Sequence, residues 1–172
     1  MNFYDTVIRN SKAYRSDGRY GGMDLLEPGT RSAVIALVQE AHDAGIDIRV
    51  LETYRSQTRQ SYLFMQKATQ LRTVGCHGYG VAADFGVFVN GKYATDAKPY
   101  LFLRKLARKH KLISGLDWGK AGPVSWDSGH VQRVPVWRQA ALFAGTWYPP
   151  AEYDPYEDSR ASGHREVVAT LS

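Results

Sequence analysis

The side chains best suited to chemistry in this chain are two histidines and an aspartate. His77 and Asp84 stand seven residues apart, and an apolar, β-prone run surrounds the acid. His130 follows downstream in the segment 126–130, Trp-Asp-Ser-Gly-His. Imidazole nitrogens and carboxylate oxygens both ligate Zn²⁺ in a tetrahedral shell. Three such ligands leave a fourth position open, which is the arrangement of a catalytic rather than a structural zinc.

Asp127 is not needed as a ligand in this set. It precedes His130 by three residues, and a spare carboxylate beside a metal is suited to act as a general base. Two other interpretations stay open. Asp127 could cap the turn before a strand, or it could accept the second N–H of His130 and so orient that ring.

Arg55 is the second candidate catalytic residue. It follows a predicted strand and precedes a predicted helix, where a side chain can point into a cleft at the end of a sheet. A guanidinium group binds carboxylates through two hydrogen bonds and can stabilise an oxyanion. The alternative is that Arg55 covers the surface. Cys76, the single cysteine, adjoins His77, but we interpret it as a small packing residue rather than a ligand or nucleophile.

Two motifs resemble those of a known family. The pattern His-x-x-Gly-x-Ala-x-Asp, followed by acid-x-x-His, is similar to that of the D-Ala-D-Ala carboxypeptidase and L-alanyl-D-glutamate endopeptidase family of zinc peptidases (VanY-like); it is carried here by His77, Gly80, Ala82, Asp84, Asp127 and His130. The resemblance spans Leu25 to roughly Ala144. It implies a Zn²⁺ cofactor on His77, Asp84 and His130, peptidoglycan stem peptides as substrates, and a hedgehog/DD-peptidase-like fold. Arg55, within Tyr-Arg-Ser and followed by Gln60, also resembles the family's arginine motif, whose arginine contacts substrate.

The resemblance also bears on specificity. Gly75 stands where the family commonly has a serine, and Lys120 replaces an expected glycine in a stretch similar to that of the phage endolysin branch. An aspartate at position 127 is typical of that branch, so we expect an L-alanyl-D-glutamate endopeptidase rather than a D,D-carboxypeptidase. The alternative is a virion-associated structural or cell-wall-binding protein that keeps zinc for stability. Asp127 and Arg55 favour catalysis, because a structural zinc needs neither.

Hydrophobic periodicity predicts the elements that must position these residues. A first helix is expected over Arg31–Ala44 with Thr30 as its N-cap, and a second over Gln57–Leu71 with Tyr62 and Met65 facing inward. The remaining predictions are a strand from Ile46, a strand over 81–89 turned by Asn90-Gly91, a helix over 97–111, a strand over 130–134 and a helix over 135–144. Helices around a small, mainly antiparallel sheet make an α+β fold.

Composition limits the protein's class. The chain has 172 residues, 44% hydrophobic and 23% charged, which is ordinary for one globular domain. It contains no run of about 18 apolar residues, so we expect no membrane span. The N-terminus does not resemble a signal peptide. We therefore expect synthesis in a host cytoplasm and action on the cell wall, either after release through a holin-type partner or from the virion.

The charge is unevenly distributed along the chain. Residues 149–172 carry a net charge of −3, which leaves +8 on residues 1–148. We predict that 1–148 form the peptidase domain, with 1–24 as an irregular lead-in, and that 149–172 form a flexible acidic tail. A basic body attracts polyanions, so anionic cell-surface polymers are candidate partners beside peptidoglycan and virion proteins. The alternative is that the basic surface only aids solubility, and nothing indicates specific nucleic-acid binding.

Overall fold

The computed structural model describes residues 1–117 and 127–164. The helices are α1 (Phe3–Thr6), α2 (Pro28–Asp43), α3 (Gln57–Met65), α4 (Phe102–Lys109), α5 (Val136–Phe143) and α6 (Pro155–Ala161). The strands are β1 (Asp47–Glu52), β2 (Ala82–Val89), β3 (Lys92–Tyr93), β4 (Ile113–Ser114) and β5 (His130–Gln132). Short 3-10 turns join several of these elements.

The strands form one antiparallel sheet in the order β1-β2-β5-β4, with β3 paired to β2. The predicted hairpin closes β2 onto β3, and its residues Asn90 and Gly91 both have positive φ (52° and 75°). Two such residues match the backbone twist of the flanking strands. The predicted α+β architecture with a small antiparallel sheet is confirmed.

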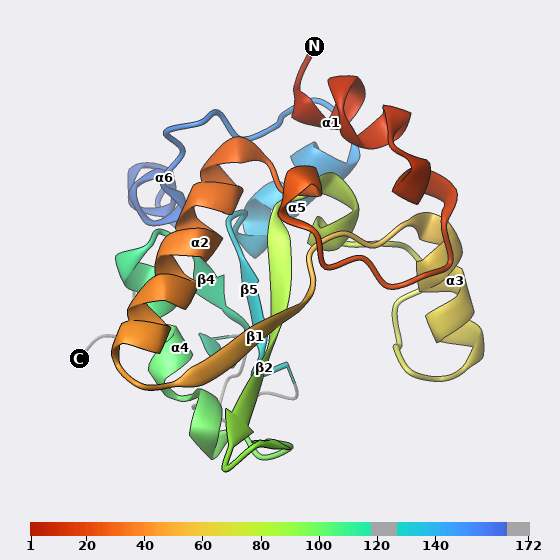
Figure 1. Ribbon diagram of the computed structural model, residues 1–172. Coiled ribbons are helices and arrows are strands. Elements are labelled where there is room, and N and C mark those ends of the chain that lie inside the picture. The colour runs from red at the N-terminus through yellow and green to blue at the C-terminus, as the bar shows by residue number, and fades with distance from the viewer. Residues whose placement is uncertain (118–126, 165–172) are drawn as a thin grey trace.

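The two faces of the sheet have different roles. Helices α2 and α4 lie on one side of the sheet and α3 on the other (Figure 1). Alternate residues of β2, namely Ala83, Phe85 and Val87, face the main core, which also holds Leu37 and Leu103. Side chains alternate between faces along a strand. The residues between them on β2 therefore face the side of α3, where the candidate site lies.

Helix α2 begins earlier than the sequence predicts. Its N-cap is Glu27 rather than Thr30, and the Glu27 carboxylate accepts hydrogen bonds from the backbone N–H groups of Gly29 and Thr30. Pro28 takes the first helical position, where its fixed φ suits the helix and its missing N–H costs nothing. Thr30 is buried inside the first turn, and its hydroxyl donates to Glu27 at 2.8 Å.

Helix α3 differs from its prediction in length and in orientation. It ends at Met65, and Lys67 follows with a positive φ of 57°, so the chain turns before Leu71. Tyr62 and Met65 are 46% and 70% exposed, whereas Arg59 and Gln60 are buried. The inner face of α3 is polar because it covers the charged face of the sheet rather than the apolar core.

The predicted tail is packed over the part that the structure describes. Tyr153, Tyr156 and Ser159 are buried, and the hydroxyl of Tyr156 donates to the carbonyl of Leu112 at 2.7 Å. Asp154 caps α6 by accepting hydrogen bonds from two backbone N–H groups. The net negative charge of this segment predicted a flexible tail, but two of its tyrosines, Tyr153 and Tyr156, are buried against the body. Residues 165–172 lie outside the described residues, and the domain boundary after residue 148 stays a prediction.

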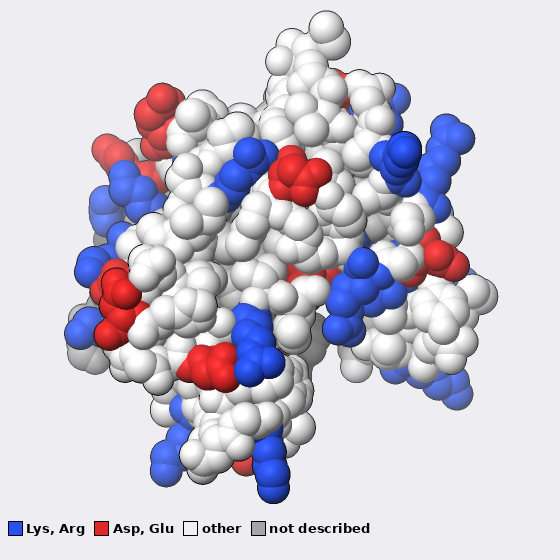
Figure 2. Space-filling view, in the orientation of Figure 1, with Lys and Arg blue, Asp and Glu red and all other residues white. Residues whose placement is uncertain are grey.

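The surface does not carry one strongly basic face in the view of Figure 2, where positive and negative side chains intermingle. Several cations of the body pair with acids: Lys109 with Glu40 at 2.7 Å, and Arg104 with Asp117 at 2.7 Å. Among residues 1–117 and 127–164, no helix has the length and apolar character needed to cross a membrane.

Candidate metal centre and active site

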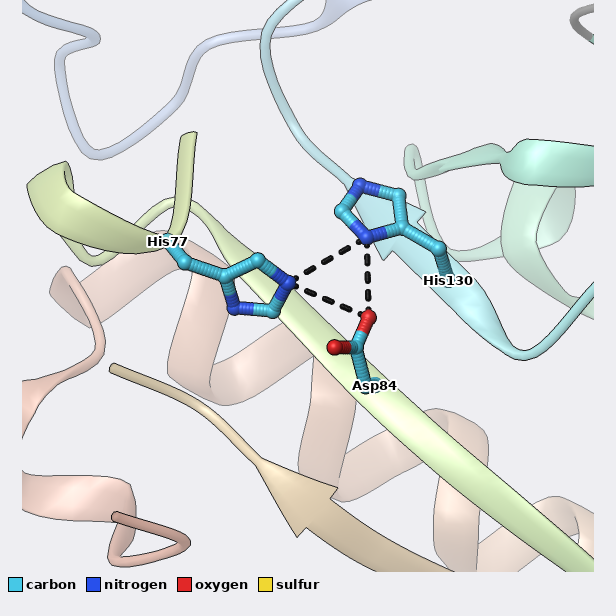
Figure 3. Close-up of side chains that lie close together, drawn as sticks. All are labelled: His77, Asp84 and His130. Carbon is cyan, nitrogen blue, oxygen red and sulfur yellow. Dashed lines mark hydrogen bonds and ion pairs between the residues drawn. The ribbon is translucent and has the colours of Figure 1, made fainter. Parts of the chain in front are cut away.

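Three potential metal-ligand atoms converge on the face of the sheet that α3 covers. His77 Nε2 lies 3.1 Å from Asp84 Oδ1 and 3.3 Å from His130 Nδ1, and His130 Nδ1 lies 2.9 Å from Asp84 Oδ1. The three side chains point toward one another from separate segments (Figure 3). Both imidazoles are buried at 5% exposure. The structure thus brings together the three residues that the sequence selects as ligands.

The sheet positions two of the three directly. Asp84 on β2 stands opposite His130 on β5 in the antiparallel register, and opposite residues have neighbouring side chains on one face. His77 belongs to the 3-10 turn Cys76–Tyr79, which lies just before β2 in the chain. Gly80 ends that turn with φ of 70°, and a Cβ there would lie 2.4 Å from the carbonyl oxygen of Leu25. Only glycine fits this corner, which aims His77 at the sheet.

Gln132 determines which nitrogen of His130 faces the cluster. His130 Nε2 lies 3.0 Å from Gln132 Oε1, and the amide nitrogen of Gln132 donates to the carbonyl of Val134. The amide oxygen can only accept, so Nε2 carries the proton and Nδ1 of the neutral ring holds a lone pair. Asp84 Oδ1, also an acceptor, lies 2.9 Å from that nitrogen. Two acceptors this close require a shared cation, either a proton or a metal ion.

The donor set fits zinc. Zinc bonds of about 2.0–2.1 Å in a tetrahedral shell separate neighbouring donor atoms by about 3.3 Å. The three observed separations run from 2.9 to 3.3 Å, and one carboxylate with two imidazoles is a donor set that zinc prefers. Within the described part of the chain, His77 Nδ1 is buried without a hydrogen-bond partner, so its Nε2 is the nitrogen available to the cluster.

The electrostatics of the cluster depend on a cation. Burial alone would raise the pKa of Asp84, but the imidazoles of His77 and His130 hold that pKa well below its usual range. Burial acts to lower the pKa of His130, but its hydrogen bonds to Asp84 and Gln132 and the charges of Asp84 and Asp127 together raise it above its usual value. Without metal, a proton between His130 Nδ1 and Asp84 Oδ1 balances the charge of Asp84. A metal ion would replace that proton.

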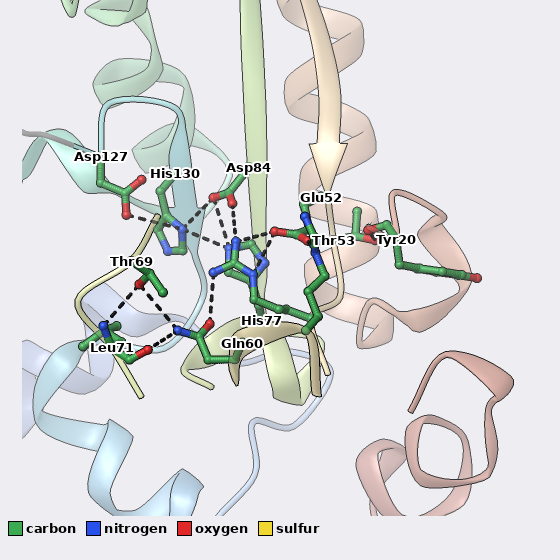
Figure 4. A network of polar contacts seen from close by, with 12 residues as sticks. Tyr20, Glu52, Thr53, Gln60, Thr69, Leu71, His77, Asp84, Asp127 and His130 are labelled. Atoms are coloured by element: carbon green, nitrogen blue, oxygen red, sulfur yellow. Dashed lines mark hydrogen bonds and ion pairs between the residues drawn. The ribbon is translucent and has the colours of Figure 1, made fainter. Parts of the chain in front are cut away.

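Asp127 lies on the ligand side of His130. Its Oδ2 is 4.0 Å from His130 Nδ1, and Figure 4 shows its carboxylate beside that ring. The N–H on the far side of the ring donates to Gln132 instead. Gln132, and not Asp127, therefore orients the His130 ring. Burial raises the pKa of the Asp127 carboxyl group. A carboxylate placed here can reach a molecule bound beside the three ligand atoms.

Arg55 is held by a buried acid that the sequence does not single out. Its Nε and Nη2 both donate to Glu52, the first at 2.9 Å, and Nη2 also donates to Asp84 Oδ2 at 3.2 Å. Nη1 donates to Gln60 at 3.3 Å. Glu52 is 4% exposed and also accepts from Arg59 at 2.5 Å. Arg55 therefore contacts the outer oxygen of a predicted ligand, and it is not simply a surface residue.

A β-bulge turns Glu52 toward the site. Val50 pairs with Phe85 and Glu52 pairs with Asp84, which leaves Leu51 as the extra residue. In a regular strand, residues 50 and 52 would share a face, and Val50 packs against the core. The extra residue moves Glu52 to the opposite face, beside Asp84. Simple alternation of side chains along β1 could not have placed Glu52 on this face.

Two adjoining cavities run past the cluster. One of about 490 Å³ is lined by His77, His130, Gln132, Val136 and Gln139 among others. The other, of about 460 Å³, is lined by Glu52, Arg59, Tyr93, Thr95 and Ser128 among others. They share Arg55, Leu63, Ala68, Asp84 and Asp127. Asp84 and Asp127 thus lie where the two cavities meet, and His77 and His130 line the one of about 490 Å³.

The remaining sequence features have plain structural roles or lie outside the described residues. Cys76 is buried in a small apolar cluster with Val81 and Leu142, as expected of a packing residue. Burial raises the pKa of its thiol to about 12, which disfavours the reactive thiolate. Gly75 has open space around it. Lys120 and Trp126 fall outside the described residues.

Comparisons with known proteins agree with this fold. The chain is similar to the L-Ala D-Glu endopeptidase ChiX of Serratia marcescens, with a TM-score of 0.50 and 18% identity over 68% of this chain and 90% of that one. It is also similar to the LD-carboxypeptidase LdcB, with a TM-score of 0.51 and 16% identity over 70% of this chain and 64% of that one. Such identities show the fold alone, and the fold that the sequence resemblance implies is confirmed. A scan against family models and a search of curated proteins give no match.

Proposed function

We propose that this protein is a zinc-dependent peptidase that hydrolyses a stem-peptide bond of peptidoglycan. In its finer form, the proposal is that the protein is an L-alanyl-D-glutamate endopeptidase. One observation carries the proposal: the lone-pair atoms of His77, Asp84 and His130 converge within 3.3 Å of one another. Such a cluster requires a cation, and a carboxylate lies beside it. The fold shared with ChiX and LdcB supports the same substrate class.

In this proposal His77 Nε2, Asp84 Oδ1 and His130 Nδ1 hold the zinc. When bound, zinc supplies a Lewis acid that activates water and polarises a carbonyl group. The Gln132 amide keeps His130 in the tautomer that presents Nδ1. Arg55 donates to the outer oxygen of Asp84, which leaves Oδ1 to face the ion.

The proton steps fall to Asp127. Its carboxylate takes a proton from the attacking water and then transfers it to the nitrogen of the scissile bond. The leaving group therefore departs as a neutral amine rather than as an amide anion. Arg55 lines both cavities, where a guanidinium group can also stabilise the oxyanion of the tetrahedral intermediate. Both roles need a substrate carbonyl close to the three ligand atoms.

The finer assignment rests on the shape of the site. An endopeptidase must hold peptide on both sides of the bond that it cuts, whereas a carboxypeptidase needs room for only a terminal residue on one side. Among the described residues, a cavity of about 490 Å³ contains all three candidate ligands, and one of about 460 Å³ adjoins it at Asp84 and Asp127. Two adjoining cavities that both contain Asp84 and Asp127 support the endopeptidase over the D,D-carboxypeptidase.

The variant Asp127→Asn tests the proposal. It keeps the shape of the side chain and removes the basic oxygen. We expect zinc content and melting temperature close to those of the unmodified protein, and turnover of purified peptidoglycan lower by about 10²–10⁴-fold. Asp43→Asn, on an exposed acid at the end of α2, is the matched control and should keep full activity. Mass spectrometry of the digest identifies the bond.

Two outcomes would contradict the proposal. If the unmodified protein holds one zinc yet cleaves no peptidoglycan, the domain is a structural or wall-binding component. If His77→Ala, Asp84→Ala and His130→Ala each keep one zinc per chain, the ligand assignment is wrong.

A further inference from the structure

We infer that Arg19, in the lead-in segment, binds a carboxylate group of the substrate. The inference rests on the proposed function for its substrate and extends it to a residue outside both motifs. Arg19 lines the cavity of about 460 Å³ that also contains Asp84 and Asp127. The cavity therefore reaches from the candidate ligand Asp84 to a guanidinium group in the segment before α2.

Arg19 differs from the other two arginines of this cavity. Arg55 and Arg59 are both bonded to Glu52, and Arg55 also contacts Asp84. Arg19 is exposed and makes no ion pair or hydrogen bond with any side chain among residues 1–117 and 127–164. Of the three guanidinium groups, it is the one whose donors are available to an incoming anion.

The backbone around Arg19 is fixed against the body. Two side chains at the start of α3 donate to this segment: Ser56 Oγ to the carbonyl of Ser16, and Arg59 Nη1 to that of Asp17 at 3.2 Å. On the other side of Arg19, Thr53 donates its backbone N–H to the carbonyl of Tyr20 at 2.8 Å. Figure 4 shows Tyr20 beside Thr53. A fixed backbone lowers the entropy cost of holding the side chain over the groove.

The chemistry of the groove indicates a carboxylate as the ligand. A guanidinium fork matches a carboxylate with two parallel hydrogen bonds. The bond that we propose is cut joins alanine to a glutamyl residue, and a glutamyl residue has two carboxyl groups, of which one continues the chain. The other is free to meet Arg19 while the peptide bond lies against the ligand cluster.

Arg19→Gln tests this inference, with Arg15→Gln as the matched control. Arg15 is also an exposed arginine of the lead-in segment, but it does not line the cavity. On a peptide whose glutamyl carboxylate is free, Arg19→Gln should raise KM by about 10-fold or more, as expected for the loss of a charged hydrogen bond. kcat and zinc content should change little. On the same peptide with that carboxylate amidated, Arg19→Gln and the unmodified protein should have equal KM.

Equal KM values for Arg19→Gln and Arg15→Gln on both peptides would overturn the inference while leaving the peptidase function intact. If the unmodified protein cleaves neither peptide, calorimetric binding of the two peptides to the zinc-loaded protein separates the two claims. Preference for the free carboxylate that Arg19→Gln abolishes would then support the inference without the peptidase activity. No such preference would overturn it.

Discussion

At the scale of single residues, Gln132 determines which ring nitrogen of His130 can bind a metal ion. His130 and Gln132 lie on the same face of β5, two residues apart, and their contact of 3.0 Å fixes the proton on Nε2. Glu52 has a comparable influence on Arg55, which it holds against Asp84. Neither Gln132 nor Glu52 belongs to a motif. Both act through a partner that the sequence had already singled out.

Gln132→Leu should weaken metal binding. The variant removes the acceptor for His130 Nε2–H, so the ring is free to adopt the other tautomer. We expect zinc affinity to fall by about 10–100-fold, measured by competition with a chelator, and activity to recover when zinc is added. Gln139→Leu, which changes the same cavity without touching His130, is the control. Unchanged affinity in Gln132→Leu would mean that the tautomer is set elsewhere.

At the scale of elements, the site depends on how strands and turns meet. The register of β2 against β5 places Asp84 opposite His130, and the bulge in β1 places Glu52 opposite Asp84. The glycine corner at the start of β2 aims His77 at both. A change at that corner should therefore affect the fold and the candidate metal centre together.

Gly80→Ala tests this corner against Gly91→Ala. Both glycines have positive φ, 70° and 75°, so both substitutions carry a backbone cost of about 1–2 kcal/mol. Only at Gly80 would the new Cβ also meet backbone, 2.4 Å from the carbonyl oxygen of Leu25, whereas Gly91 has open space. We expect Gly80→Ala to lower the free energy of unfolding and the zinc affinity more than Gly91→Ala, as measured by urea denaturation and zinc titration. Equal effects would show that the corner yields without disturbing His77.

At the scale of the whole molecule, the C-terminal segment is part of the body rather than an appendage. Arg133, buried at 4% exposure, bonds Glu27 at the start of α2 and donates to the carbonyls of Ala151 and Tyr153. Trp137 of α5 donates to Ser159 at 3.0 Å. These contacts join the C-terminal segment to the start of α2 and to α5.

Deleting residues 151–172 should therefore lower stability. Removing one buried aromatic side chain costs about 3 kcal/mol or more, which in a protein of this size corresponds to about 6–12 °C in Tm. Zinc stoichiometry should stay at one per chain, because none of the three candidate ligands lies in the deleted segment. Tyr156→Phe, which loses only the hydrogen bond to Leu112, should lower Tm much less. An unchanged Tm after deletion would restore the flexible tail predicted from composition.

The same segment should loosen in acid. Arg138 donates to Asp158 at 2.9 and 3.0 Å and holds the pKa of that carboxyl group below its usual value. A lowered folded-state pKa contributes stability above the unfolded-state pKa of about 4, and this contribution is lost as the pH falls through the folded-state pKa. The stability difference between the unmodified protein and Asp158→Asn should thus be largest near neutral pH and vanish in acid. A difference independent of pH would exclude the charge as its cause.

The sequence by itself was enough for the features that depend on local pattern. Helical spacing and strand alternation predicted the main elements, because they reflect burial along a short stretch of chain. The residue types of His77, Asp84 and His130 suggested a metal site, and the resemblance of their two motifs to those of zinc peptidases marked them as one group. Asp127 and Arg55 could be selected by the same chemical reasoning, although their functional roles remain proposals.

Only the tertiary structure decided which side chains support that group. Glu52 reaches the site through a bulge, and a bulge is visible only when two strands are paired. The inner face of α3 is polar because it contacts this charged face of the sheet. The spacing of the apolar residues in α3 therefore predicts the wrong buried face. Tyr153 packs against Trp147, and Tyr156 contacts Leu112 and Arg108. Each of these depends on contacts between residues far apart in the chain, which local sequence pattern does not encode.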